Sequence, residues 1–141
     1  MSLVLQSTWG IDPGAFALPA IVWLVLAVTA VANGIFRETV LIARYPEHRA
    51  HRLSTAMLVA IILTITGLYF ASLGQAHTVA ERIAIGVGWA VLTVGFEFLV
   101  GHLEDTPIEE TIRQYDVRAG EVWIAVPLTL LVSPLFFGWL L

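Results

Sequence analysis

The chain has 141 residues, of which 58% are hydrophobic and only 13% are charged, and its mean hydropathy is +0.85. Soluble domains carry about 25% charged residues, so water is not the main solvent of this chain. The absence of cysteine excludes disulfides, thiolate metal sites and cysteine nucleophiles. A net charge of −4 on so apolar a chain also argues against nucleic acid as a partner.

Four apolar stretches are long enough to cross a bilayer as helices, because a helical span needs about 20 residues. They cover residues 16–36, 53–74, 83–103 and 122–141. Backbone polar groups in hydrocarbon must be paired within a helix or a closed barrel, and these stretches lack the alternation of barrel strands. The sequence therefore predicts an all-α fold, a four-helix transmembrane bundle, in one domain over residues 1–141.

The distribution of basic residues predicts the orientation of the bundle. All seven are arginine; six lie in the first and third connections between spans, and only Arg82 lies in the second. Connections rich in arginine stay on the cytoplasmic side of a membrane. We therefore expect a multi-pass protein of the cell's inner (plasma) membrane, with both termini outside.

Prolines in the two arginine-rich connections predict where helices end and begin. Tyr45-Pro46 should end the first helix and let the second begin before the membrane, because the residue before proline avoids helical conformations. Thr106-Pro107-Ile108-Glu109 has the pattern of a capping box. It predicts a short amphipathic helix on the cytoplasmic side, between spans three and four, that seals the bundle, lies among lipid headgroups or receives a partner.

Small and polar residues recur every three or four positions in the later spans, a pattern that lets membrane helices approach closely. These stripes are predicted to face the bundle interior. Pro127 and Pro134 are candidate kinks in the fourth span. The members of the three stripes are Ala56, Ala60, Thr64, Gly67, Ala71 and Gly74; Gly86, Ala90, Thr93, Glu97 and Gly101; and Glu121, Ala125, Thr129 and Ser133.

Glu97 is the acidic residue that the sequence places inside a span, about five residues or roughly 8 Å from its cytoplasmic end. A carboxylate at that depth needs a partner, a proton or water. Asn33 and Arg37, one turn apart on the first helix, should reach the same leaflet. The sequence thus predicts a polar cluster of Asn33, Arg37 and Glu97, with His102 and Asp116 on the same side of the membrane.

Two interpretations of this cluster stay open. It is either a buried network that fixes the register of the helices or a proton or cation site in which Arg37 tunes the pKa of Glu97. No catalytic residue, cofactor or metal site is expected elsewhere. His48 and His51 lack the spacing of a specific metal site, no span interior supplies histidines for haem, and there is no phosphate-binding glycine motif.

Several short motifs occur in a fixed order along the chain. They are Asn33-Gly34-x-x-Arg37-Glu38, Glu47 to His51, Gly88-Trp89, Leu92-Thr93, Phe96-Glu97-Phe98, Gly101-His102 and Tyr115-Asp116 leading to Gly120. Together they resemble a family of small four-span prokaryotic membrane proteins without an assigned function, over most of the chain from Asn33 onward. The resemblance implies no activity, but it implies that the polar residues of the cytoplasmic leaflet belong together. Glu121 stands where family members often have a basic residue, after the glycine that opens the last span.

Three classes of function follow, and the first is favoured. The chain is a non-enzymatic structural or accessory membrane protein, a small oligomeric channel or proton-linked transporter that uses Glu97, or a membrane enzyme that acts on lipid headgroups. The expected partners are membrane lipids and either further copies of the chain or another membrane protein. The enzyme would need His102, Asp116 and loop acids to converge on a cleft.

Overall fold

The computed structural model describes residues 10–72, 77–113, 115–116 and 122–140. These residues form helices and no strands, which confirms the predicted all-α class. The ends predicted at Gly74 and Leu141 lie outside them, as do Arg118, Gly120 and Glu121. The elements are η1 (Pro13–Phe16), α2 (Ala17–Phe36), η2 (Arg37–Leu41), α3 (Ile42–Arg44), α4 (Glu47–Ser72), α5 (Val79–Leu103), α6 (Ile108–Arg113) and α7 (Ala125–Leu140).

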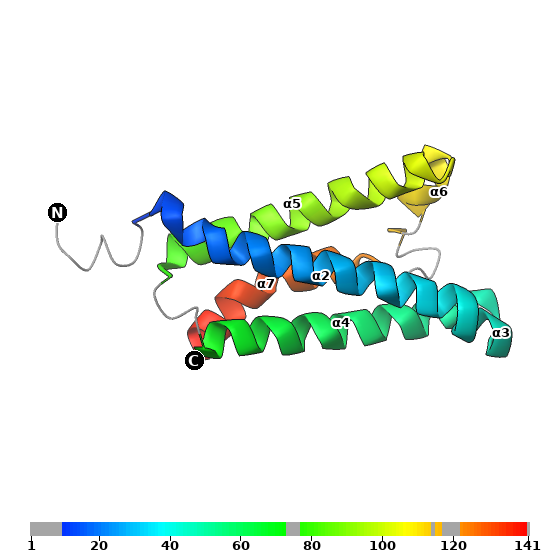
Figure 1. Ribbon diagram of the computed structural model, residues 1–141, viewed down its shortest axis with the longest axis horizontal. Coiled ribbons are helices and arrows are strands. Elements are labelled where there is room, and N and C mark those ends of the chain that lie inside the picture. The colour runs from blue at the N-terminus through cyan, green and yellow to red at the C-terminus, as the bar shows by residue number, and fades with distance from the viewer. Residues whose placement is uncertain (1–9, 73–76, 114, 117–121, 141) are drawn as a thin grey trace.

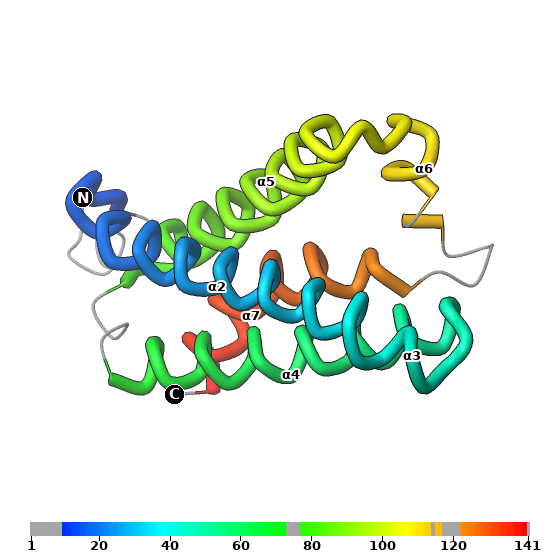
Figure 2. Tube along the Cα trace, turned by 45° about the vertical axis from the view of Figure 1, so that its right-hand side comes forward, coloured from blue at the N-terminus to red at the C-terminus, as the bar shows by residue number. Residues whose placement is uncertain are grey.

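The long helices lie side by side along the long axis of the molecule, and α2 and α5 run opposite to α4 and α7 (Figure 1). Helix α7 packs against both α4 and α5, while α2 packs mainly on α4 (Figure 2). We call the two ends of the bundle the His77 end, where α2 and α5 begin, and the Arg49 end, where α4 begins. Three helical stretches, Pro13–Arg44, Glu47–Ser72 and Val79–Leu103, are long and apolar enough to cross a membrane.

The first helical stretch ends where Tyr45-Pro46 predicts, beyond the predicted membrane span. It continues from α2 through the π-helical η2 and α3 as far as Arg44, eight residues past the end of that span at Phe36. Tyr45 is extended, with φ −133° and ψ 155°, and Pro46 follows it. The proline, not the first charged residue, therefore ends the helix, as the restriction on residues before proline requires.

Helix α5 begins at Val79, four residues before the predicted start of the third span. Thr78 is its N-cap: the threonine side chain accepts from the backbone N–H of Glu81, and the Glu81 side chain accepts from the backbone N–H of Thr78. This reciprocal pair is a capping box. It brings the charged Glu81 and Arg82 into the first turn of the helix.

Helix α7 has 16 residues, fewer than the predicted fourth span over residues 122–141. It begins at Ala125, so Pro127 lies in the first turn, where a missing backbone N–H breaks no helical hydrogen bond. Pro134 lies inside the helix and is buried. Residues 122–124 precede the helix in a turn.

The core lies where α4, α5 and α7 meet α2, and large side chains dominate it. The prediction that the small-residue stripe of the second span faces inward is wrong, because Ala56, Ala60 and Thr64 are exposed. The hydroxyl of Thr64 donates to the backbone oxygen of Ala60 at 2.8 Å, so it needs no partner in the interior. The buried residues of α4 are instead Ala50, Ser54, Thr55, Leu58, Ile62, Thr66, Tyr69 and Phe70.

In α5 the small residues do mark a close approach. A Cβ atom added to Gly86 would overlap the backbone carbonyl oxygen of Leu131 in α7, whereas one added to Gly88 would meet nothing within 4 Å. Backbone cannot move aside as a flexible side chain can, so Gly86 lets the two helices touch along their main chains.

We therefore expect Gly86→Ala to lower the free energy of unfolding by about 1–3 kcal/mol, the usual effect of overpacking. Gly88→Ala, two residues along the same helix, should leave it unchanged or raise it slightly, because alanine favours helix more than glycine does. Thermal unfolding of the purified protein in detergent measures both. Equal effects of the two substitutions would contradict the close approach.

Candidate functional site

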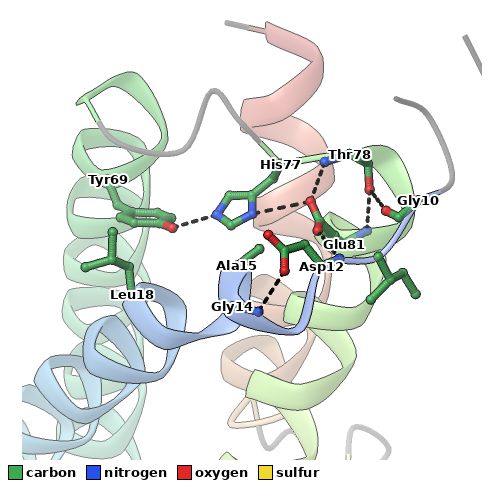
Figure 3. A pocket seen from close by; sticks show the side chains of 10 residues that line it. Gly10, Asp12, Gly14, Ala15, Leu18, Tyr69, His77, Thr78 and Glu81 are labelled. Atoms are coloured by element: carbon green, nitrogen blue, oxygen red, sulfur yellow. Dashed lines mark hydrogen bonds and ion pairs between the residues drawn. The ribbon is translucent and has the colours of Figure 1, made fainter. Parts of the chain in front are cut away.

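A pocket of about 490 Å³ opens at the His77 end of the bundle, where three chain segments meet (Figure 3). Asp12 comes from the segment before η1, Tyr69 from the last turns of α4, and His77, Thr78 and Glu81 from the start of α5. Apolar side chains, among them Ile11 and Leu18, complete its lining. The pocket thus combines a carboxylate pair, an imidazole and a phenol with apolar walls.

The Glu81 side chain is held by backbone groups of two of these segments. The residue is 3% exposed. Its Oε1 atom accepts from the backbone N–H of Thr78 at 2.8 Å, and its Oε2 atom accepts from the backbone N–H of Asp12, also at 2.8 Å. The hydroxyl of Thr78 donates to the backbone oxygen of Gly10 at 2.6 Å. The start of α5 is therefore joined to the segment before η1.

His77 lies between Glu81 and Tyr69 and is 7% exposed. The Tyr69 hydroxyl and His77 Nε2 are 2.7 Å apart, and His77 Nδ1 is 3.8 Å from Glu81 Oε1. The nearby carboxylate favours a proton on Nδ1, so Nε2 accepts from the Tyr69 hydroxyl. Arg82 donates through Nη2 to the backbone oxygen of His77 at 3.1 Å.

Burial lowers the pKa of His77 below its ordinary value of 6.5. The negative charge of Glu81 acts in the opposite direction, and the positive charge of Arg82 adds to the lowering. Desolvation is the largest of these effects, because it removes water from the charged imidazolium. His77 is consequently neutral around pH 7, the form in which Nε2 can accept a hydrogen bond.

Glu81, His77 and Tyr69 place a carboxylate, an imidazole and a hydroxyl in a row. Such an arrangement can orient the imidazole and transfer a proton. Here both carboxylate oxygens of Glu81 already accept hydrogen bonds from backbone N–H groups, and the imidazole of His77 already accepts a hydrogen bond from the hydroxyl of Tyr69. The set is therefore arranged first of all as a joint between chain segments. Among the described residues, no group of three or more histidine, aspartate or glutamate side chains is arranged to hold a metal ion.

Of the residues that the sequence predicts to cluster, Asn33 is buried between helices. The hydroxyl of Ser54 in α4 donates to Asn33 Oδ1 at 2.5 Å, which links α4 to α2. Arg37, one turn on, forms an ion pair with its neighbour Glu38, with 3.3 Å between Nε and Oε1. The two predicted neighbours thus have different partners.

Glu97 is half-buried in α5 near the Arg49 end. Burial, and then the charge of Glu97, raise the pKa of Tyr115 to about 12, with the neighbouring Trp123 acting in the opposite direction. The Trp123 ring lies 5.6 Å from the ring of His51 in α4. The side of α5 that carries Glu97 therefore faces the segment that leads from α6 to α7.

His102 and Asp116 have exposed side chains. Neither lines the pocket of Figure 3, which lies at the opposite end of the bundle. The residues predicted to cluster thus come from several helices and one connecting segment: Asn33 is buried, Glu97 is half-buried, and the side chains of His102 and Asp116 are exposed.

The pocket at the His77 end does not follow from the sequence analysis, although one signal for it is present. Thr78-Val79-Ala80-Glu81 has the same capping-box pattern that predicts a helix after Thr106. That pattern would have extended the third span back to Val79 and placed Glu81 in its first turn. Nothing in the sequence indicates that the carboxylate also reaches the backbone of Asp12, 69 residues away.

The lowered pKa of His77 predicts how stability depends on pH. The unfolded chain takes up a proton near pH 6.5, but the folded chain does so only at lower pH, so stability is full above pH 6.5 and falls as the pH decreases through the folded-state pKa. Chemical unfolding between pH 5 and pH 8 measures this. His77→Gln should flatten that part of the profile; an unchanged profile in this variant would contradict the assignment to His77.

No family model, no curated protein and no solved structure matches this chain. The case for a function therefore rests on its residues and their geometry.

Proposed function

We propose that the chain is a non-enzymatic accessory protein of the plasma membrane that crosses it four times, with both termini outside. The observation that supports the proposal is a set of hydrogen bonds in which polar side chains connect one helix or chain segment to another. Glu81 is the clearest case, because its buried carboxylate accepts backbone N–H groups from two chain segments.

Similar ties recur along the bundle. The indole N–H of Trp23 in α2 donates to the hydroxyl of Thr93 in α5 at 3.0 Å, and that of Trp89 in α5 donates to the backbone oxygen of Pro19 in α2, also at 3.0 Å. Ser54 joins α4 to α2 through Asn33. Interhelical hydrogen bonds of this kind hold membrane bundles together and select one register, which supports a structural role.

The placement of arginines supports the orientation. Among the described residues, Arg82 lies at the His77 end, while the other arginines lie at or near the Arg49 end: Arg37, Arg44, Arg49, Arg52 and Arg113. The positive-inside rule then puts the Arg49 end in the cytoplasm and the pocket of Figure 3 at the outer face.

Helix α7 supplies the fourth span of the proposal. Its 16 residues extend about 24 Å, less than the roughly 30 Å of a hydrocarbon core. A short span is accommodated by local thinning of the bilayer and by neighbouring helices. The position of α7 against both α4 and α5 supports this, since its neighbours are long enough to cross.

Helix α6 belongs to the cytoplasmic face in this orientation. Thr111 is buried, and a Cβ atom added to Gly101 would lie 2.9 Å from its hydroxyl, so α6 turns back onto the end of α5. Ile108 and Ile112 are 64% and 55% exposed, which suits the headgroup region of the membrane better than a seal over the bundle.

Exposed apolar side chains on α2 identify the surface available to a partner. In the apolar part of the stretch Pro13–Arg44 only 11% of residues are buried inside the protein, against 39% for Glu47–Ser72. Lipid, a further copy of the chain or another membrane protein would cover this face. An accessory protein needs such a surface.

A second candidate is proton or cation transport through Glu97. It is favoured by the half-buried position of this carboxylate, whose charge is close enough to raise the pKa of Tyr115. An ionisable residue within a span is a recurrent feature of proton pathways. The two candidate functions differ in whether the protein conducts protons or cations across the membrane.

Liposomes that contain the purified protein separate them. The accessory proposal expects no protein-dependent proton or cation flux, while Glu97→Gln lowers thermal stability more than Glu38→Gln, whose side chain is 60% exposed. The expected difference is about 1–3 kcal/mol, as for other buried groups that lose a partner. A flux that disappears in Glu97→Gln but persists in Glu38→Gln would overturn the accessory proposal in favour of transport.

A further inference from the structure

A groove of about 540 Å³ lies at the Arg49 end, against the first turns of α4. Its lining consists of Pro46, His48, Arg49, Arg52 and Leu53. The wall of the groove is almost entirely apolar, and two of the residues that form it are arginines. The groove is separate from the pocket of Figure 3, which lies at the other end of α4.

Arg49 is arranged to present hydrogen-bond donors. Its guanidinium lies over the ring of Tyr45, 5.9 Å from the ring centroid. A cation–π contact uses none of the N–H donors of the guanidinium, and the planar fork of these donors matches the oxygen atoms of a phosphate. Arg52 follows three residues later, so both side chains project from the same side of the helix.

The segment that forms the groove carries a net positive charge. Residues 44–53 contain Arg44, Arg49 and Arg52 against the single acid Glu47. Helix α4 has 26 residues, and its first turn adds backbone N–H groups that are not paired within the helix. Arginines and helix start together make a site for an anionic group with two or more oxygens.

The surroundings of the groove identify which anion fits. Leu53 and Met57 continue the line of Arg49 at intervals of four residues, and they are 37% and 40% exposed. They begin the apolar surface of a helix that is long enough to cross a membrane. An anion bound between the arginines is thus adjacent to hydrocarbon, as the phosphate of a phospholipid is.

We propose that this groove binds an anionic phospholipid, with the phosphate on Arg49 and Arg52 and an acyl chain along Leu53 and Met57. Basic grooves beside transmembrane helices on the cytoplasmic side recognise such headgroups. The assignment rests on the proposed orientation, with the Arg49 end in the cytoplasm, but not on the accessory role.

The test compares phosphatidylglycerol with phosphatidylcholine of the same acyl chains, added to the full chain in mild detergent and followed by native mass spectrometry. We expect phosphatidylglycerol to bind about tenfold or more tightly, given what each arginine adds near an anionic headgroup. The double variant Arg49→Gln, Arg52→Gln should lose this preference. Equal binding of the two lipids to the unaltered protein would overturn the proposal without recourse to any variant.

The matched control is the double variant Arg44→Gln, Arg113→Gln, which removes the same charge from the same end of the bundle but leaves the groove intact. It should keep the preference for phosphatidylglycerol; a loss equal to that of the groove variant would show attraction to arginines in general and refute a site. Competition with inorganic phosphate distinguishes a lipid headgroup from a free phosphate ion as the ligand of the groove. If it displaces the lipid at equal concentration, the groove is a phosphate site and the proposed occupant is wrong.

Discussion

The carboxylate of Glu81 must be stabilised mainly by groups of the protein, because only 3% of the residue is exposed to water. Backbone N–H groups of Thr78 and Asp12 supply that stabilisation, and in doing so they fix two things at once. They set the residue at which α5 begins, and they hold the start of the first helical stretch against α5. His77 Nδ1 then lies 3.8 Å from the Glu81 carboxylate. The imidazole also accepts a hydrogen bond from the Tyr69 hydroxyl, which connects the end of α4 to the same group of residues.

The same constraint accounts for several other contacts in the bundle. A polar side chain in an apolar environment is stabilised when it is paired within the protein, and Trp23, Trp89 and Ser54 each donate to a neighbouring helix. Threonines that lack such a neighbour donate to their own helix, as Thr29 and Thr64 do. Where no polar tie is available, close contact replaces it, and Gly86 lets α5 meet the main chain of α7.

Periodicity and composition were sufficient to predict the helices, because apolar stretches of about 20 residues have few alternatives to a helix. The ends were less predictable. Pro46 ends the first helical stretch as the sequence predicts, but α5 begins earlier and α7 begins later than the predicted spans. The inward stripe predicted on α4 was wrong because small size does not show which face is buried when large side chains such as Phe70 fill the core. The pocket depends on contacts between residues 69 positions apart, which no local pattern encodes.

The central claim is that polar side chains hold this bundle together, with Glu81 as the joint at the His77 end. Amide hydrogen exchange in lipid nanodiscs tests it most directly, comparing the unaltered chain with Glu81→Ala. If the carboxylate is the acceptor, the amides of Asp12 and Thr78 exchange faster in the variant while amides in the middle of α5, around Trp89, stay protected. Unchanged exchange at Asp12 and Thr78 would show that the joint does not depend on Glu81 and would contradict the account.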